Sequence, residues 1–172
     1  MQNEQNLLPG EKLRQAMRHW LTGVAVVTSQ FQELRHGMTV NSFGSISLDP
    51  PLVTVTMNNN TRTYAVVQQS NVFAVTVLSH LQQPIADLFA GRLMHEPPDR
   101  FAGLDVFTMQ TGSPLLAGGM AFVDCRVVQQ IPMLHSTLFV GEVLEAQHAD
   151  AGPNGEALSP LLYYNRKFLL LD

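Results

Sequence analysis

The sequence predicts a mainly β protein, an antiparallel barrel or sandwich with a few peripheral α-helices. Three observations lead to this prediction. About seven short segments are rich in β-branched residues and bounded by turn residues. Only three short segments show helical character. Strands mostly follow strands along the chain, which disfavours the alternating strand–helix units of a doubly wound parallel sheet.

The predicted helices are short and lie in the first half of the chain. They cover residues 11–21, 60–70 and 84–90. In the first, apolar residues recur at the spacing of one helical face. Asn60, Thr61 and Thr63 are candidate N-caps of the second, and Gly91 stands just beyond the end of the third, where a glycine favours helix termination.

The predicted strands alternate polar and apolar residues or form short apolar runs between turns. They cover residues 23–29, 36–48, 52–57, 71–79, 120–133, 136–147 and 160–171. The segment 92–114 carries prolines, glycines and charges with little periodicity and predicts a long surface loop, and 148–159 predicts a second loop.

Length and composition predict one domain over residues 1–172, with residues 1–10 as a flexible N-terminal tail. The chain is 45% hydrophobic and only 14% charged, which excludes disorder and favours an oligomer that hides part of its surface. The net charge of -4, with no basic run, argues against nucleic acid as a partner.

The chain carries signs of a cytoplasmic protein that does not enter a membrane. Cys125 is the single cysteine and cannot form an intrachain disulfide, which suits a reducing compartment. The first residues lack the charged and apolar regions of a signal peptide. No apolar run approaches the roughly 20 residues that span a bilayer.

Several common catalytic and binding motifs are absent from the sequence. It has no dinucleotide-binding glycine fingerprint, no phosphate-binding P-loop and no nucleophile elbow. The six histidines show no paired spacing typical of metal ligands, so no metal is expected. Cys125 falls in the middle of an apolar strand and is expected to be a buried, unreactive thiol.

The stretch "HGMTVNSFGSISLDPP", residues 36–51, is more polar than a buried strand requires. Thr39, Asn41 and Ser42 offer neutral hydrogen-bonding groups, and the helix start near Thr61 offers free amides that favour an anion. Arg92 could supply a compensating charge. This combination suits a flat polar heterocycle with a phosphate tail. Ordinary strand threonines and a simple helix cap would give the same pattern, and the residues alone leave both interpretations open.

The chain resembles the flavin reductase family, whose fold is the FMN-binding split barrel. The likeness begins with the stretch "GMTVNSFGSISLDPPLVTVTMNNNTRT". It continues in family order through "FAVTVLS", "IADLFAGR", "DRFAGLDV", "GSPLLAGGMAFVDCRVV", "HSTLFVGEV" and "PLLYYNRKF". Residues 14–168 are covered, and many collinear matches are far more specific than any single one.

The resemblance implies a fold, an activity and partners. The fold is an antiparallel split β-barrel with peripheral helices, in a homodimer. The activity is hydride transfer from NADH or NADPH to FMN or FAD, with reduced flavin supplied to a flavin-dependent monooxygenase. Two alternatives stay open: reduction of another acceptor such as a corrinoid, and flavin binding without reductase activity.

The resemblance also implies which residues contact the flavin. The segment along the isoalloxazine ring consists of Thr39, Val40, Asn41 and Ser42. The next contacts with the flavin are Ser47 and Leu48. The residues that approach its phosphate are Thr61, Thr63, Ala90, Gly91 and Arg92. The residues that border the pocket near the C-terminus are Tyr164 and Arg166.

His135 matches the family histidine implicated in nicotinamide binding and reactivity. One departure lies beside it. The family usually has Gly-Asp immediately before this histidine, where the present chain has Met133 and Leu134. The loss of an acidic neighbour and a flexible glycine alters the charge and the loop geometry at this position, which favours the alternative without reductase activity.

Overall fold

The computed structural model describes residues 8–92, 97–152 and 154–171. Most of the tail expected over residues 1–10 therefore lies outside the described residues. The helices are α1 (Pro9–Met17), α2 (Arg62–Ser70) and α3 (Gln83–Phe89), with a short 3-10 helix at His80–Gln82. The strands of the first half are β1 (Thr22–Gly23), β2 (Ala25–Phe31), β3 (Leu34–Val40), β4 (Gly44–Leu48), β5 (Pro51–Asn58) and β6 (Val72–Val77). Those of the second half are β7 (Val106–Thr108), β8 (Pro114–Leu116), β9 (Ala121–Met133), β10 (Ser136–His148), β11 (Leu162–Tyr164) and β12 (Lys167–Leu169).

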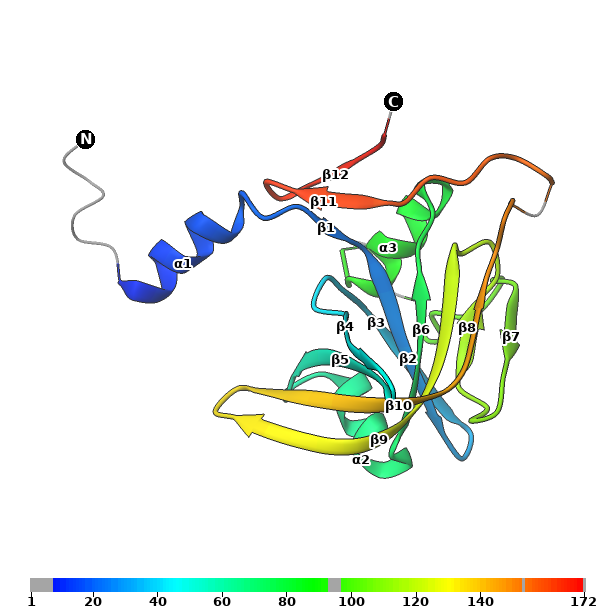
Figure 1. Ribbon diagram of the computed structural model, residues 1–172, viewed down its shortest axis with the longest axis horizontal. Coiled ribbons are helices and arrows are strands. Elements are labelled where there is room, and N and C mark those ends of the chain that lie inside the picture. The colour runs from blue at the N-terminus through cyan, green and yellow to red at the C-terminus, as the bar shows by residue number, and fades with distance from the viewer. Residues whose placement is uncertain (1–7, 93–96, 153, 172) are drawn as a thin grey trace.

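Every pairing between the described strands is antiparallel, which confirms a mainly β fold with few helices. Seven strands form the main sheet in the order β3-β2-β6-β9-β10-β5-β4. A three-stranded sheet, β1-β11-β12, and the β7–β8 hairpin complete the described structure. Figure 1 shows the long β9–β10 hairpin running across the front of the main sheet.

The main sheet curls, because its two edge strands are neighbours in the chain. Strands β3 and β4 lie at opposite edges, yet only residues 41–43 join them. Four Cα–Cα steps span at most about 15 Å, whereas six strand spacings in a flat sheet would separate the edges by about 29 Å. The Ser42 hydroxyl bonds both backbone groups of Thr56 on β5, which fixes the crossing point.

Local sequence explains where helices α2 and α3 begin and end. Thr61 caps α2 by accepting a hydrogen bond from the Tyr64 amide, at 3.3 Å. This selects one of the three candidate N-caps. Gly91, just beyond α3, has a φ of 67°, which a glycine adopts without steric cost. Both helix predictions are confirmed to within two residues.

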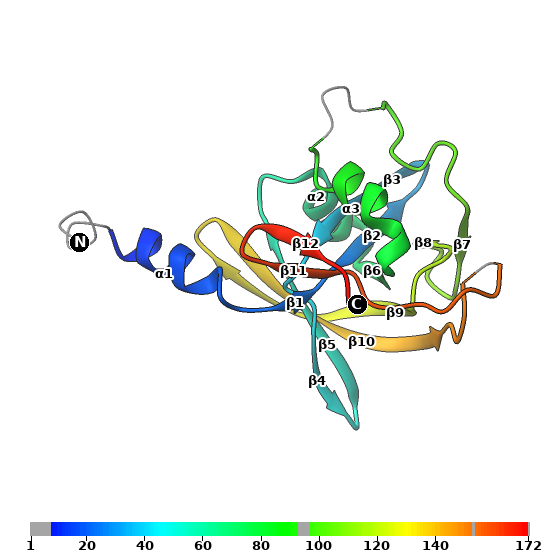
Figure 2. The same cartoon turned by 90° about the horizontal axis from the view of Figure 1, so that it is seen from above.

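Helices α2 and α3 both pack against β3. Helix α2 contacts β2 and β3, and α3 contacts β3. Gly37 on β3 permits the close approach of α3, because a Cβ there would lie 2.9 Å from the ring of Phe89. In Figure 2 both helices lie on the same side of the molecule as β3. His36 and Gly37 of β3 therefore lie beside the start of α2 and the end of α3.

Two groups of buried side chains form most of the core. One lies between the strands of the main sheet and α2, and its largest members are Phe73, Phe139, Met57 and Val55. The other lies beneath α3 and the C-terminal hairpin, and it includes Leu78, Phe89, Phe101, Leu116 and Leu161. The second group anchors α3 and β11 to the sheet, and thereby fixes the walls of the cavities described below.

The structure corrects four expectations. The polar stretch over residues 36–51 is two strands and the start of a third, with a register irregularity between Ser45 and Ser47. The last predicted strand is the β11–β12 hairpin, whose turn places Asn165 and Arg166 at positive φ. The loop expected over 92–114 contains β7 and the start of β8. The first helix, expected over residues 11–21, is α1 and ends at Met17; it has no buried residue and extends away from the body of the molecule (Figure 1).

Candidate functional site

Four cavities lie in a row along β3 and share lining residues with their neighbours. The central cavity, of about 190 Å³, is lined by Val24, Thr39, Val40, Asn41, Ala90, Arg92, Tyr163 and Phe168. The helix cavity, of about 340 Å³, is lined by His36, Met38, Thr39, Thr61, Arg62, Thr63, Phe89, Ala90 and Arg100. It shares Thr39 and Ala90 with the central cavity. The row therefore follows β3 from its C-terminal end, at Val40, toward the start of α2.

The other two cavities extend the row at each end. The terminal cavity, of about 270 Å³, is lined by Arg14, Met17, Arg18, Trp20, Asn41, Tyr163, Asn165 and Arg166. The outer cavity, of about 250 Å³, is lined by Glu33, Leu34, Arg35, His36, Gly37, Arg62, Pro97, Pro98, Asp99, Arg100 and Phe101. The terminal cavity joins the central one at Asn41 and Tyr163. The outer cavity joins the helix cavity at His36, Arg62 and Arg100.

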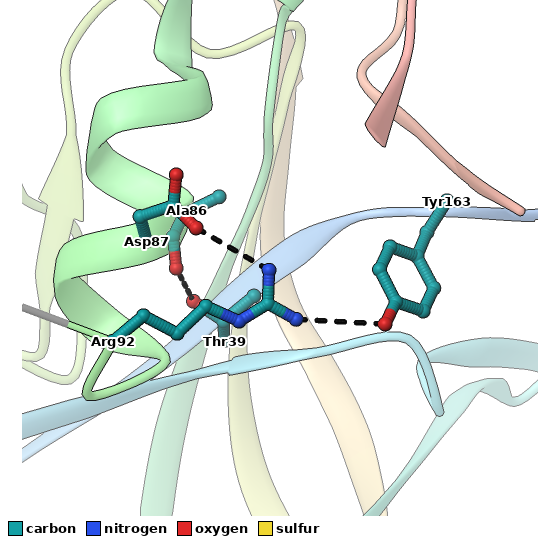
Figure 3. A network of polar contacts seen from close by, with 5 residues as sticks. All are labelled: Thr39, Ala86, Asp87, Arg92 and Tyr163. Atoms are coloured by element: carbon teal, nitrogen blue, oxygen red, sulfur yellow. Dashed lines mark hydrogen bonds and ion pairs between the residues drawn. The ribbon is translucent and has the colours of Figure 1, made fainter. Parts of the chain in front are cut away.

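The central cavity combines neutral polar groups with aromatic and aliphatic walls. The Thr39 hydroxyl donates to the Ala86 carbonyl oxygen of α3 at 2.6 Å, so its own oxygen keeps acceptor capacity (Figure 3). Arg92 pairs with Asp87 at 3.3 Å and donates to the Tyr163 hydroxyl at 3.5 Å. Figure 3 shows these contacts linking the end of α3 to β3 and β11. Such a lining suits a flat heterocycle whose edges need neutral hydrogen-bond partners.

The helix cavity is suited to an anion. It lies at the N-terminus of α2, where backbone N–H groups and the helix dipole favour negative charge. Arg62 and Arg100 both line it. Arg100 is held by the carbonyl oxygens of Gly37 and Phe89, at 3.4 and 3.3 Å. Arg62 is exposed and has no ion-pair partner among the described residues, which leaves its charge available to a ligand.

The two threonines at this helix start already have protein partners. The Thr61 hydroxyl donates to the Asn58 carbonyl oxygen at 2.8 Å and caps the helix. Thr63 is fully buried, and its hydroxyl lies 2.8 Å from Nδ1 of His36. Thr63 therefore fixes the orientation of the His36 ring at the junction of two cavities. The arginines are better placed than the threonines to contact a phosphate.

The structure brings together most of the residues that the resemblance assigned to one site. Those that line the central or helix cavity are Thr39, Val40, Asn41, Thr61, Thr63, Ala90 and Arg92. Arg166 lines the adjoining terminal cavity. Arg92 lies in the central cavity, not in the helix cavity with the threonines. Its expected role near the flavin phosphate stays a prediction.

Other assigned residues lie outside these cavities in the described chain. Ser42 bonds β5, and Gly91 terminates α3. Ser47 donates to the Pro50 carbonyl oxygen, and Leu48 is 89% exposed, on the β4–β5 hairpin that projects from the body in Figure 2. Tyr164 faces His19, with its hydroxyl 3.5 Å from Nδ1 of that ring.

His135 is exposed in the turn between β9 and β10 and lines none of the four cavities. Its carbonyl oxygen accepts a hydrogen bond from the Asn59 amide at 3.0 Å. Asn59 also accepts from the Thr137 hydroxyl at 2.9 Å. These contacts tie the turn to the end of β5, two residues before Thr61. The backbone of His135 therefore lies close to the start of α2.

Sequence reasoning missed four polar residues that line the central or the helix cavity. They are His36, Arg62, Arg100 and Tyr163. Arg62 could have been found, because it stands between the two threonines of a predicted helix start. Tyr163 directly precedes the residue that was assigned. His36 and Arg100 reach the site only through tertiary packing, and no local pattern indicates them.

Two groups have shifted pKa values: Asp99, which lines the outer cavity, and Cys125, which lies in the core. The Arg35 guanidinium donates to Asp99 at 2.6 Å and, with the Phe101 amide, lowers the pKa of that carboxyl, so the pair is ionised at neutral pH. Burial raises the pKa of the Cys125 thiol to about 12, and the nearby Asp124 contributes. Cys125 therefore remains a protonated thiol with no nucleophilic role.

Comparison with known proteins assigns the chain to a family. Residues 17–171 match the family model described as flavin reductase like domain. The chain is 35% identical over 156 residues to the NADH-dependent flavin reductase StyB of Pseudomonas fluorescens, covering 90% of this chain and 86% of that protein. It is 36% identical to the FMN reductase (NADH) SmoA of Agrobacterium fabrum, covering 89% of this chain and 87% of that protein.

Solved structures agree with these relatives. The flavin reductase PheA2 superimposes with a TM-score of 0.84 at 30% identity, covering 96% of this chain and 99% of that one. The styrene monooxygenase flavin reductase of Pseudomonas putida S12 superimposes with a TM-score of 0.77 at 33% identity, covering 92% and 96%. The resemblance carried by the motifs is confirmed over almost the whole chain. This protein belongs to the flavin reductase like domain family.

Proposed function

We propose that this protein is an NADH-dependent flavin reductase that transfers a hydride from the nicotinamide to FMN or FAD. The observation that carries the proposal is the row of cavities along β3. The central cavity offers neutral hydrogen-bonding groups to a flat ring, and the adjoining helix cavity offers two arginines to a phosphate. The relatives named above carry the same activity in their names. One relative, of Rhodococcus opacus, is named as the reductase component of a 4-nitrophenol monooxygenase system. Reduced flavin from the present protein would serve a flavin-dependent monooxygenase.

The residues present fit a flavin. Thr39 and Asn41 would hold the polar edge of the ring, with Val40 and Ala90 along its face. Arg62 and Arg100 would hold the phosphate at the start of α2. When bound, the flavin supplies the hydride acceptor. We also propose that the flavin contacts Ser42, Ser47 and Leu48, because the family motif assigns them to it.

The chain's own contribution is position and exclusion of water. The contact between Thr39 and Ala86 fixes the floor of the central cavity. The ion pair of Arg92 with Asp87 holds that arginine against the rings of Tyr163 and Phe168, whose centroids lie 5.8 and 5.2 Å from its guanidinium carbon. These walls would hold the flavin ring in place, and hydride transfer requires a second flat ring to stack against it in close contact.

His135 would orient the nicotinamide, as the family motif implies. Its turn carries Met133 and Leu134 in place of the family's usual Gly-Asp, and these side chains are 48% and 89% exposed. These exposed apolar side chains would pack against the nicotinamide nucleotide or against a neighbouring subunit. Tyr164 and Arg166 would border the same opening from the C-terminal hairpin.

The proposal extends to architecture and assembly. The curled sheet, whose edges are joined by residues 41–43, supports a split barrel, and the family match over 17–171 supports a single domain. The side chains of Leu13 and Met17 on α1, and of Trp20 just beyond it, are between 52% and 65% exposed and support a homodimer. No helix in the described part of the chain could span a membrane. The lone buried thiol is consistent with a cytoplasmic location.

The test is NADH oxidation by the purified protein, followed at 340 nm with free FMN or FAD as acceptor. The proposal predicts turnover with NADH and with at least one of the two flavins. Parallel assays with NADPH establish the donor preference. Flavin binding without nucleotide oxidation would identify a flavin-binding module instead, and binding of neither flavin would refute the proposed function altogether.

A further inference from the structure

Arg100 reaches the helix cavity from a turn between α3 and β7 that belongs to no helix or strand. Its guanidinium donates to the carbonyl oxygens of Gly37 and Phe89 at 3.4 and 3.3 Å. Both distances exceed the usual range of about 2.7–3.2 Å for such hydrogen bonds, so these two contacts hold the guanidinium weakly. A defined position for Arg100 therefore depends also on how its two chain neighbours are anchored.

Both neighbours of Arg100 are anchored, and Arg35 of β3 contacts each of them. Phe101 is 2% exposed, and its ring packs edge-on against Phe89 with the centroids 5.1 Å apart. Asp99 accepts from the Arg35 guanidinium at 2.6 Å and, with its other oxygen, from the Phe101 amide at 2.9 Å. The Arg35 guanidinium also lies over the Phe101 ring, with its central carbon 4.8 Å from the centroid. Arg35 therefore ties the residues on either side of Arg100 to β3.

The pair of Arg35 with Asp99 is suited to a local effect rather than to stabilising the whole fold. Its two side chains are 35% and 45% exposed, and an ion pair that water reaches contributes little to the free energy of unfolding. Without the pair, the turn that carries Arg100 would sample more positions. The entropy lost when a phosphate orders the guanidinium would then weaken phosphate binding.

Resting on the proposed function, we infer that Arg35 and Asp99 are positioning residues for the flavin phosphate and act through Arg100. Both line the outer cavity and not the helix cavity, so their role is to hold Arg100 and not to contact the phosphate of FMN. The ion pair keeps the turn against β3, and the turn keeps the Arg100 guanidinium in the helix cavity beside the start of α2.

The sign of one substitution separates positioning from simple electrostatics. Asp99 is an anion near the proposed phosphate site, so the loss of its charge would by Coulomb's law alone strengthen FMN binding. Positioning predicts weaker binding instead. Asp99→Asn preserves the shape of the side chain and an oxygen acceptor for the Phe101 amide, and it removes the charge that pairs with Arg35.

The test is isothermal titration calorimetry with FMN and with riboflavin, which lacks the phosphate. Asp99→Asn should raise the dissociation constant of FMN about threefold, within the strength of a partly exposed ion pair, and leave that of riboflavin unchanged. The double variant Arg35→Gln/Asp99→Asn has the net charge of the wild type and should still show the loss. Arg35→Lys retains a cation opposite Asp99 and should bind FMN as the wild type does.

The matched control is Arg126→Gln. Arg126 pairs with Glu142 at 2.6 Å, the same distance as the Arg35–Asp99 pair, and lines none of the four cavities. This variant should leave the affinities for FMN and riboflavin unchanged. Unchanged or tighter FMN binding in Asp99→Asn would refute the inference, and so would an equal loss of FMN and riboflavin affinity, which would show a general effect on the fold.

A second background tests the route through Arg100. In an Arg100→Gln protein, Asp99→Asn should cause no further loss of FMN affinity, because the group that the ion pair positions is gone. The same loss in both backgrounds would overturn the inference and leave the proposed function standing. If the wild-type protein binds neither FMN nor riboflavin, or binds them equally, the proposed phosphate site fails and the inference fails with it.

Discussion

Arg62→Gln should weaken FMN binding without weakening riboflavin binding. Arg62 is the first residue of α2 and lines the helix cavity, and it has no ion-pair partner among the described residues. A hydrogen bond from a charged donor is worth about 1.5–3 kcal/mol, and partial exposure places Arg62 at the lower end of this range. A loss of about 1.4 kcal/mol corresponds to a tenfold higher dissociation constant for FMN.

The substitution should leave the fold intact, which makes the binding result interpretable. A positive charge at a helix N-terminus opposes the helix dipole, so Arg62→Gln removes an unfavourable interaction and should not destabilise α2. The cap from Thr61 to the Tyr64 amide stays in place. Thermal unfolding of the variant should therefore begin at the wild-type temperature or slightly above it.

The assay is isothermal titration with FMN and riboflavin at two salt concentrations. The wild-type preference for FMN should decrease as salt rises, because the Debye length shortens from about 10 Å at 0.1 M to about 3 Å at 1 M. The preference should be smaller in Arg62→Gln and unchanged in Arg126→Gln. An FMN dissociation constant within twofold of wild type, or an equal loss for riboflavin, would refute the placement of the phosphate at α2.

Three further predictions test other parts of the structure. His135→Ala should lower kcat for NADH oxidation by about ten- to a hundredfold. Flavin binding should stay near normal, because the turn that carries His135 is held through its backbone. An unchanged kcat would remove His135 from the mechanism. Gly141→Ala should destabilise the fold by about 1–3 kcal/mol in urea denaturation, since a Cβ there would lie 2.5 Å from the Phe73 ring, and wild-type stability would contradict this packing. The Cys125 thiol, with its pKa raised to about 12, should stay protonated and unreactive toward a disulfide reagent at pH 8 until the protein unfolds; rapid labelling of the native protein would show that it is not buried.

Local patterns predicted the elements whose ends have a local cause. Helix α2 begins at a threonine that bonds its own third amide, and α3 ends before a glycine at positive φ. In each case the residues that form the signal lie within a few positions of each other in the sequence. The break in the polar stretch at residues 41–43 has no local cause. The chain crosses there from one edge of the main sheet to the other, and which strands form those edges depends on the order of all seven strands.

The site was predictable where it follows one strand and not where it depends on packing. Thr39 lies on β3 and Asn41 directly follows that strand, and the motif around them is specific. Arg100 enters the helix cavity from a segment far along the chain, held by the carbonyl oxygens of Gly37 and Phe89. Arg92 was expected at the phosphate end because it follows α3. Its contacts with Asp87 and Tyr163 hold it in the adjoining central cavity, and its role at the phosphate stays a prediction.

The central claim is that β3 and the start of α2 form one flavin site, and a crystal structure of the protein with bound FMN tests it most directly. The account predicts the ring in the central cavity beside Thr39 and Asn41, with the phosphate within hydrogen-bond distance of Arg62 or Arg100. A phosphate bound at Arg92, or a ring held outside the central cavity, would contradict it.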